Sequence, residues 1–424
     1  MTRMKESGID WIGQIPEEWE VIKVKFFTYM KGRIGWQGLK ADEFIDEGPY
    51  LVTGTDFKNG RVNWDTAYHI SQKRYEQAPE IQLKQGDLLV TKDGTVGKLA
   101  LIDELPDSAS LNSHLLVLRP LFNRYDNHFL YYVLSSLEFK NYFQKVSIGS
   151  TMDSLSQEKM GEFIFALPNI NEQNSISRYL DKKTAQLDKA KELLEEQIQK
   201  LKDYRASLIY ETVTKGLDKT VPMKDSGIDW IGQVPEGWGV KPLKYLASYD
   251  DESLTQSEIN SNQKINYVDI GAVEFTKGIN GYQELLMSEA PSRARKIAKK
   301  GDTIISTVRT YLKAIAYLND DYIVSTGFCV VRPKKVNSKY LNYTIMSDSF
   351  TGPVSKYAWG VSYPAISSSQ LVNIPIPFPE SIEEQLSIVD YLDHKMLQIN
   401  QLIDIKQEQI ENINKQRQTL IYDY

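Results

Sequence analysis

Few residue patterns in this chain of 424 residues have the types and spacing that catalysis requires. Gly94-Thr95-Val96-Gly97-Lys98 resembles the end of a phosphate-binding loop. Such a loop also needs a glycine five residues before its Gly-Lys pair and a Ser or Thr after it, to cradle phosphates and hold magnesium. Lys92 and Leu99 occupy these two places, so the sequence argues against a nucleotide site.

Other catalytic chemistries also lack their residues. A metal-dependent nuclease needs clustered acids and a lysine around the ion, and Asp107 with Glu138 and Lys140 matches this only superficially. Base methylation would need an Asn-Pro-Pro-aromatic loop or a Pro-Cys nucleophile, and the sequence contains neither. We therefore expect no catalysis and no bound cofactor or metal. The four histidines are too scattered in the sequence to show the spacing of metal ligands: His69, His114, His128 and His394.

The chain does carry residues suited to reading DNA. Bases are read by Arg, Lys, Asn, Gln, Ser or Thr side chains on loops, with aromatic residues nearby. The first half has three such segments: a glycine-rich segment, a segment after a predicted strand, and a loop after Gly149. Their candidate DNA-binding residues are Lys31, Arg33, Trp36 and Gln37, then Lys92, Thr95 and Lys98, then Ser150 and Thr151.

Matching segments in the second half hold different side chains. A basic run there favours phosphate contacts over base reading. For any one of these residues the alternative is an ordinary solvated loop, and Trp36 and Trp359 are equally compatible with local packing. The candidate DNA-binding residues are Arg309, Tyr311 and Lys313 on one loop, Tyr357, Trp359 and Tyr363 on a later loop, and Arg293 and Arg295 in the basic run, which also holds Lys296, Lys299 and Lys300.

These loops belong to a duplicated framework. Residues 4–21 read MKESGIDWIGQIPEEWEV and residues 223–240 read MKDSGIDWIGQVPEGWGV, with 14 of 18 positions identical. This period is far too long for a solenoid or propeller repeat, so it indicates two structural units, each about half of the chain. Two such copies form a pseudo-two-fold object, whose natural ligand has two similar, separated sites, as duplex DNA does.

Recurring and divergent positions predict different roles. Gly-Asp pairs at 86–87 and 301–302 recur, and so do Arg119 and Arg332 beside proline. Residues that discriminate between DNA sequences should differ between the copies, and Arg119 and Arg332, which recur identically beside proline, suit a structural role. The same argument assigns four tryptophans to packing or to a surface shared with a partner: Trp11, Trp19, Trp230 and Trp238.

Two long helices are the clearest structural prediction. Residues 171–215 contain no glycine or proline, and Lys215-Gly216 is a good C-terminal stop. Apolar residues recur at heptad spacing in both segments, which indicates coiled-coil packing. The predicted seam residues are Leu180, Leu187, Leu194, Ile198, Leu201 and Leu208 in the first helix and Leu392, Met396, Ile399, Ile403, Ile410, Ile413 and Leu420 in the second.

The order of the segments favours an antiparallel helix pair, because the second helix must return toward the start of the chain. The expected fold is α+β: a mixed domain over 1–168, a long helix within 169–219, a second mixed domain over 220–379 and a second helix over 380–424. Strands ending in glycine are predicted at 49–54 and 265–271, and turn-then-strand units at 86–90 and 301–305. Helices with aromatic inner faces are predicted at 125–143 and 340–350.

Bulk composition is that of a globular protein. Hydrophobic residues make up 41% and charged residues 25% of the chain, and no apolar run is long enough to span a membrane. The single cysteine, Cys329, is expected to be a buried small hydrophobe. We expect a cytoplasmic protein. A net charge of −6 predicts either a local DNA-binding surface or a partner that supplies phosphate contacts.

This layout resembles the specificity subunit of type I restriction–modification enzymes. The resemblance covers nearly the whole chain and includes Ser7-Gly8-Ile9-Asp10-Trp11-Ile12-Gly13, its copy at 226–232, and the Glu-Gln helix entries at 172–173 and 384–385. It implies that each mixed domain is a target-recognition domain for one half of a bipartite DNA site. The coiled coil then sets the spacer between the two halves.

The resemblance also implies partners. Two adenine-N6 methyltransferase subunits would dock on the chain, and restriction and translocase subunits would join them. S-adenosylmethionine, ATP and Mg belong to those partners, and none is expected on this chain. The alternative is a two-domain scaffold that binds proteins rather than DNA.

Overall fold

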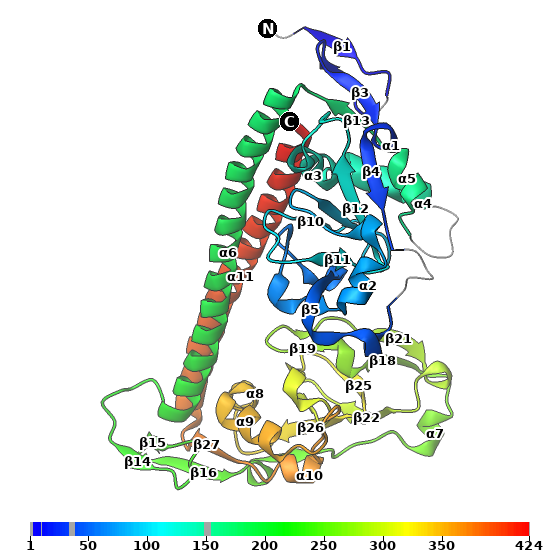
Figure 1. Ribbon diagram of the computed structural model, residues 1–424. Coiled ribbons are helices and arrows are strands. Elements are labelled where there is room, and N and C mark those ends of the chain that lie inside the picture. The colour runs from blue at the N-terminus through cyan, green and yellow to red at the C-terminus, as the bar shows by residue number, and fades with distance from the viewer. Residues whose placement is uncertain (1–2, 10, 34–38, 148–153, 424) are drawn as a thin grey trace. The chain divides into compact units, whose positions relative to one another are not determined.

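The chain folds into two units of similar construction. The computed structural model in Figure 1 describes residues 3–9, 11–33, 39–147 and 154–423. Unit 1 comprises residues 1–194 with 408–424, and unit 2 comprises residues 195–407. Each unit therefore combines one mixed domain with parts of both long helices.

A six-stranded sheet forms the centre of unit 1, with the strand order β4-β12-β9-β10-β7-β6. Every residue of β9 is buried. Successive side chains of a strand point to opposite faces, and accordingly Leu88 and Val90 enter one hydrophobic core while Leu89 enters another. The strands span Thr28–Lys31, Leu115–Pro120, Leu88–Thr91, Leu99–Leu101, Arg61–Val62 and Phe57–Lys58 in that order.

Three smaller sheets complete unit 1. The first has the order β11-β5-β8, and its β11 and β5 run parallel. The other two are the antiparallel pairs β1–β2 and β3–β13. The bounds are Ala109–Leu111 (β11), Ile45–Val52 (β5), Tyr68–His69 (β8), Met4–Glu6 (β1), Gln14–Pro16 (β2), Glu20–Lys23 (β3) and Ile164–Leu167 (β13).

Unit 2 repeats this plan. Its central sheet has the order β17-β26-β23-β24, and β23 is again buried throughout. Ile305 packs into one core and Ile304 into another, as Leu88 and Leu89 do in unit 1. The strands span Ala247–Tyr249, Phe328–Pro333, Thr303–Ser306 and Ile315–Tyr317 in that order.

The remaining sheets of unit 2 differ from those of unit 1 in two respects: β19 and β20 form a separate antiparallel pair, and one sheet has an additional strand. β18 and β25 run parallel, as β5 and β11 do, and an extra strand, β22, joins at the edge beside β25. The bounds are Gln283–Leu286 (β21), Lys264–Val268 (β18), Tyr322–Ser325 (β25), Ala294–Ala298 (β22), Val273–Glu274 (β19), Gly278–Ile279 (β20), Trp238–Pro242 (β16), Pro375–Pro379 (β27), Met223–Asp225 (β14) and Gln233–Pro235 (β15).

Each predicted aromatic helix is in fact two helices. Residues 125–143 contain α3, Asn127–Ser135, and the start of α4, Leu137–Ser147. Residues 340–350 contain most of α8, Ser338–Met346, and the start of α9, Asp348–Tyr357. Ser136 and Ser347 have extended backbones, and each hydroxyl accepts a hydrogen bond from an amide of the following helix. A serine that caps a new helix ends the old one, which the apolar pattern does not reveal.

Apart from the two long helices, the other α-helices are short. They are α1 (Val24–Phe27), α2 (Gln72–Glu76), α5 (Gln157–Gly161), α7 (Gln256–Ile259) and α10 (Ser368–Leu371).

The two long helices are confirmed. α6 spans Ile170–Lys215 and α11 spans Ile382–Asp423, with 46 and 42 residues, or about 69 and 63 Å. Gly216 follows α6 with a φ of 71°, a left-handed conformation that favours glycine. In unit 1 the beginning of α6 shares a core with the end of α11, and in unit 2 the end of α6 shares a core with the beginning of α11. The pair is therefore antiparallel, as Figure 1 shows.

The predicted seam residues lie away from the solvent. All thirteen predicted seam residues are buried or half-buried. Polar residues in the same columns are paired across the helices, because a polar group shielded from water needs a partner. Arg205 donates to Asn400 at 2.7 Å, Lys406 donates to Gln197 at 2.5 Å, and Arg417 lies 3.5 Å from Asp188.

The recurring Glu-Gln pair joins each domain to its helix. Gln173 donates to the Pro168 carbonyl at 2.8 Å and accepts from the amide of Asp126 at 3.0 Å. Gln385 donates to the Pro379 carbonyl at 2.8 Å and accepts from the amide of Asn337 at 2.7 Å. The preceding glutamates accept hydrogen bonds from the Trp19 and Trp238 indoles at 3.1 and 3.0 Å. These tryptophans are therefore structural.

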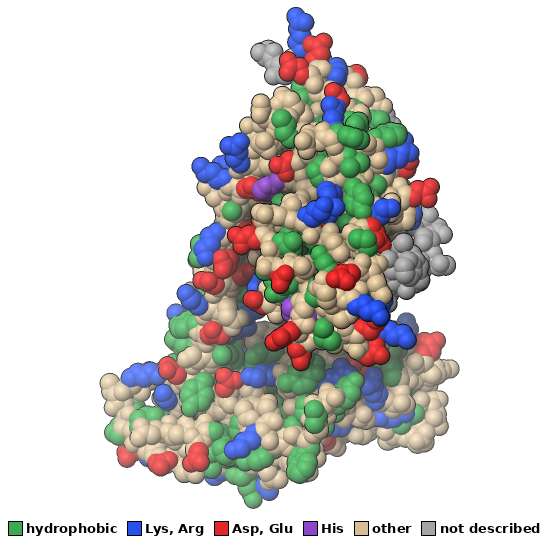
Figure 2. Space-filling view, viewed as in Figure 1, with side chains coloured by type: hydrophobic (Ala, Val, Ile, Leu, Met, Phe, Trp, Pro, Cys, Tyr) green, Lys and Arg blue, Asp and Glu red, His purple; other side chains and the backbone are tan. Residues whose placement is uncertain are grey.

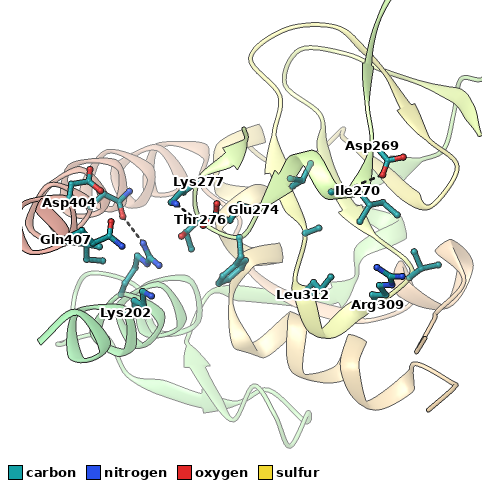
Figure 3. A pocket seen from close by; sticks show the side chains of 18 of the residues that line it. Lys202, Asp269, Ile270, Glu274, Thr276, Lys277, Arg309, Leu312, Asp404 and Gln407 are labelled. Atoms are coloured by element: carbon teal, nitrogen blue, oxygen red, sulfur yellow. Dashed lines mark hydrogen bonds and ion pairs between the residues drawn. The ribbon is translucent and has the colours of Figure 1, made fainter. Parts of the chain in front are cut away.

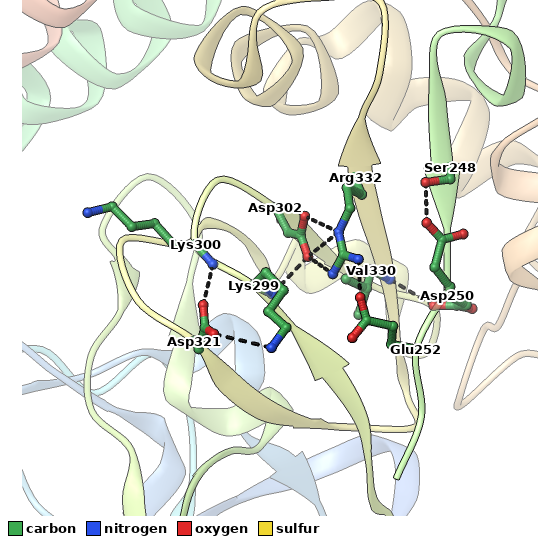
Figure 4. Close-up of polar contacts among 10 residues, drawn as sticks. Ser248, Asp250, Glu252, Lys299, Lys300, Asp302, Asp321, Val330 and Arg332 are labelled. Carbon is green, nitrogen blue, oxygen red and sulfur yellow. Dashed lines mark hydrogen bonds and ion pairs between the residues drawn. The ribbon is translucent and has the colours of Figure 1, made fainter. Parts of the chain in front are cut away.

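The recurring Asp–Arg pairs are structural as well. Arg119 forms two hydrogen bonds of 2.7 Å with Asp87, and Arg332 binds Asp302 in the same way, with its closest contact at 2.9 Å. The aspartate side chains are only 1% and 2% exposed. Arg332 also binds Glu252, as Figure 4 shows. The pairs tie the turn before each central strand to the neighbouring strand.

Cys329 is buried, as expected, and burial raises the pKa of its thiol to about 12. Within the part of the chain that the structure describes, no helix has the length and apolar character needed to cross a membrane. Figure 2 shows Lys and Arg side chains scattered among Asp and Glu side chains on the visible face of unit 1.

Candidate nucleic-acid interface

Two of the predicted DNA-binding loops meet in unit 2. The loop after β23 and the loop after α9 are about fifty residues apart in sequence, yet main-chain hydrogen bonds join them. The Arg309 amide donates to the Pro364 carbonyl at 2.7 Å, and the Ile366 amide donates to the Thr307 carbonyl at 2.8 Å. Trp359 and Ala365 exchange hydrogen bonds of 2.8 and 2.9 Å. The loops therefore form one structured surface.

This surface presents aromatic rings and a cation to the solvent. The Arg309 guanidinium lies 4.8 Å from the centre of the Tyr363 ring, which is a cation–π contact. Trp359 is 82% exposed and Tyr363 is 66% exposed. Large exposed aromatic residues beside an arginine are suited to stacking and to binding base edges or phosphates. Neither aromatic side chain is a packing anchor, which was the alternative for Trp359.

The loop after β23 has an unusual backbone. Arg309 and Lys313 adopt left-handed conformations with φ of 49° and 47°. Such a conformation costs a non-glycine residue on the order of 1 kcal/mol. The single turn between them, Thr310–Leu312, exposes Tyr311 while Thr310 stays buried. The strained backbone at Arg309 and Lys313 therefore flanks the turn that exposes Tyr311.

Two predicted residues of this surface have structural contacts. The Lys313 ammonium forms an ion pair of 2.8 Å with Asp348, so its charge is largely neutralised. Tyr357 packs edge-on against Trp230, with ring centres 6.5 Å apart. Trp230 is one of the recurring tryptophans, and its packing role is consistent with the prediction.

The basic run divides into residues that face the solvent and residues that do not. Arg293 is exposed and forms a long ion pair of 3.5 Å with Asp269. Arg295 is half-buried, and its side chain donates to the Ala294 carbonyl at 2.9 Å. The prediction of a phosphate contact is wrong for Lys296, because its ammonium is held by Asp250 at 2.7 Å and by the Phe328 carbonyl at 2.6 Å. Lys299 is paired with Asp321 at 3.3 Å (Figure 4).

Unit 1 holds the equivalent loop with the same main-chain connections. The Leu155 amide donates to the Lys92 carbonyl at 2.8 Å, which corresponds to the bond between Ile366 and Thr307 in unit 2. Thr95 is exposed within this loop, Lys98 is exposed where the loop returns to β10, and Lys92 is half-buried. A hydroxyl inside the loop, that of Thr91, donates to the Thr95 carbonyl at 2.6 Å. The loop is polar and has no exposed aromatic ring.

Arg33 requires a correction. It is predicted to read DNA, but its side chain is only 4% exposed. The guanidinium donates to the Leu111 carbonyl at 2.9 Å and to the Ser110 hydroxyl at 3.0 Å, and burial lowers its pKa to about 10. It therefore ties the segment after β4 to β11 inside the domain. Lys31 is exposed. Trp36, Gln37, Ser150 and Thr151 lie outside the described residues.

The glycine-rich segment at 94–98 is not a phosphate-binding loop. It connects β9 with β10, which pair antiparallel. A phosphate-binding loop instead joins a strand to the N-terminus of a helix, whose amides hold the anion. The strand connection therefore agrees with the sequence analysis, which argued against a nucleotide site at residues 94–98.

A cavity beside the unit 2 surface adds residues that sequence reasoning missed. Its volume is about 1130 Å³, and Arg293, Arg309 and Tyr363 are among its lining residues. Lys202 and Arg205 of α6 and Lys277 of the loop after β19 line it as well. Of these missed residues, the sequence pointed only to Arg205, because it occupies a heptad position that is normally apolar.

Comparisons with known proteins agree with this geometry. A family model for the type I restriction modification DNA specificity domain matches the chain twice, at residues 16–202 and 235–415. Both matches include one mixed domain and most of the following helix. The two matches follow the order of the sequence repeat, whereas each structural unit also takes in part of the other copy's helix.

Two curated relatives come from Methanocaldococcus jannaschii. The putative type I restriction enzyme MjaX specificity subunit is 24% identical, over 97% of this chain and 93% of the relative. The type I restriction enzyme MjaVIII specificity subunit is 26% identical, over 96% of this chain and 92% of the relative. Both relatives are named as specificity subunits, which confirms the prediction of a recognition subunit rather than a catalytic one.

A solved structure shares the fold. It comes from work on complex assembly and conformational transition of the type I R-M system, and it superposes with a TM-score of 0.71 at 18% identity, covering 96% of this chain and 97% of that chain. The duplicated α+β fold is therefore confirmed. Together with the double match to the family model, these findings show that the chain belongs to the family of type I restriction–modification DNA specificity subunits.

Proposed function

We propose that the two mixed domains are target-recognition domains that read the two halves of an asymmetric, bipartite DNA site. The observation that carries the proposal is a shared framework with unlike loops. Lys92 and Thr307 occupy the same place and make the same main-chain bonds, yet one loop presents Thr95 and Lys98 and the other presents Arg309 beside aromatic rings. Unlike side chains at matched positions are what two different half-sites require.

The helix pair is proposed to set the spacer length. A rigid pair of helices keeps two DNA-reading surfaces at a constant separation, whereas a flexible linker does not. Inserting one heptad into both α6 and α11, in register, lengthens the pair by about 10 Å. At 3.4 Å per base pair the preferred spacer should grow by about three base pairs. An unchanged spacer would contradict this part of the proposal.

We further propose that the chain acts within a complex. Two adenine-N6 methyltransferase subunits dock on it, with restriction and translocase subunits, and S-adenosylmethionine, ATP and Mg are bound by those partners. The recurring segments at 4–21 and 223–240 are suited to partners that meet both copies in the same way.

The deciding experiment is methylation of a randomised DNA library by the chain with its partner methyltransferase. We expect methylated adenines within one asymmetric bipartite motif, and no methylation when either protein is omitted. Exchanging residues 31–37 and 91–98 for those of a relative should change only one half of the motif. Exchanging residues 307–313 and 357–363 should change only the other. Methylation without any bipartite motif would favour the scaffold alternative.

A further inference from the structure

The unit 2 cavity carries more positive than negative charge. Figure 3 shows Lys202 of α6 and Asp404 of α11 on one side and Arg309 on the other. Two lining cations are already neutralised, because Lys277 pairs with Glu274 at 2.9 Å and Arg293 pairs with Asp269 at 3.5 Å. Three further cations and one exposed carboxylate remain at the cavity: Lys202, Arg205, Arg309 and Asp404.

Arg205 lacks an anionic partner. It is half-buried at the helix seam, and it donates to the neutral amide of Asn400 at 2.7 Å. Among the residues that the structure describes, no carboxylate lies within 4.0 Å of its guanidinium. Burial lowers the pKa of Arg205. A shielded cation without a counter-charge is unfavourable unless a ligand supplies one.

At the equivalent position in the other half of the helix pair, an arginine has a carboxylate partner. At the common offset of 212 residues, Arg417 corresponds to Arg205 and Asp188 corresponds to Asn400. Arg417 lies 3.5 Å from the Asp188 carboxylate, so the charge is compensated. Lys202 corresponds to Asn414, which is uncharged. Two differences, a carboxylate replaced by an amide and an amide replaced by a lysine, therefore make the unit 2 seam electropositive.

We propose that this cavity binds phosphodiester groups of the DNA backbone at the second half-site, with Lys202 and Arg205 of the helix pair as ligands. The proposal rests on the proposed function. DNA is the favoured source of phosphate because Arg309 and Tyr363, which belong to the candidate base-reading surface, line the same cavity. A guanidinium also matches the geometry of a phosphate group. The helix pair thereby contributes to DNA binding and does not act only as a spacer.

The test is Asn400→Asp in the complete complex with the methyltransferase. This change copies the Asp188–Arg417 pair, so the helix pair should keep its melting temperature. The carboxylate should neutralise Arg205 and repel phosphate. We expect about tenfold weaker DNA binding, in line with one lost charge-assisted hydrogen bond. The slope of log K against log salt should decrease in magnitude by about one, with the recognised sequence unchanged.

Asn412→Asp is the matched control, because it makes the same chemical change at an exposed position of α11. It should leave both affinity and salt slope at their original values. An unchanged slope for Asn400→Asp, or an equal decrease for both variants, would overturn the proposal. If the unaltered complex binds no bipartite sequence at all, the proposed function itself fails, and this outcome is distinct from the first two.

Discussion

The two mixed domains differ where they meet solvent and agree where they meet their own interior. Both have a central strand buried on two sides, a buried Asp–Arg pair, and a glutamine that clamps the domain to a long helix. Their loops after the central strand make the same main-chain bonds and present unlike side chains. Sequence identity between the copies therefore marks the framework, and divergence marks the surface proposed to read DNA.

The largest effect is expected from breaking the shared framework in one copy. Asp302→Ala removes the buried partner of Arg332 and leaves its contact with Glu252, and breaking a buried ion pair costs about 3 kcal/mol. Asp87→Ala should destabilise the other domain by a similar amount, because it removes the buried partner of Arg119. Hydrogen exchange should show lost protection only in the domain that carries the change. A uniform loss across both domains would contradict their independence.

A smaller and more specific effect is expected from Arg309→Ala. Losing a base-reading arginine should cost about 1–3 kcal/mol and relax specificity at one position of one half-site. Selection from a randomised DNA library measures this directly. Arg295→Ala is the control, because its side chain is directed to the Ala294 carbonyl and does not line the cavity. Relaxed specificity in both half-sites would exclude this assignment.

The cation–π contact should contribute less. Tyr363→Leu removes the ring that Arg309 lies against, and such an exposed contact is worth about 0.5–1 kcal/mol. Because Tyr363 is 66% exposed, the stability of the domain should not change. A double-mutant cycle with Arg309→Ala should show that the two losses are not additive. Additive losses would mean that the ring acts on DNA independently of the arginine.

The smallest effect concerns acid sensitivity, in which the two copies should differ. Hydrogen bonds from Lys23 and Lys25 lower the pKa of Glu162 to about 2, from an ordinary value of 4.5. Its stabilising contribution is therefore present above about pH 4.5 and is lost as the pH falls toward 2. The matching position before β27 is Asn373, which does not titrate. Acid should loosen the β3–β13 pair before the β16–β27 pair, as followed by hydrogen exchange.

Glu162→Gln supplies the control for that comparison. It removes the titrating group, so the difference in acid sensitivity between the two strand pairs should shrink. If the difference persists in this variant, another group is responsible.

Much of the framework followed from local patterns. Heptad spacing predicted both helices and thirteen apolar positions that the structure shields from solvent, because a helix that buries one face repeats its apolar residues with a fixed period. Arg119 and Arg332 were recognised as structural because both copies keep them. The breaks at Ser136 and Ser347 escaped prediction, since a serine cap interrupts a helix without changing its apolar pattern.

By itself, the sequence determined that the chain is a duplicated protein with two long paired helices, because repeats and periodicity are properties of the linear chain. Only the tertiary structure decided which polar residues face outward. Arg33 and Lys296 were indistinguishable from surface cations until the fold placed internal partners beside them. In the same way, Arg309 meets Tyr363, and Arg205 meets Asn400, across distances in sequence that no local pattern encodes.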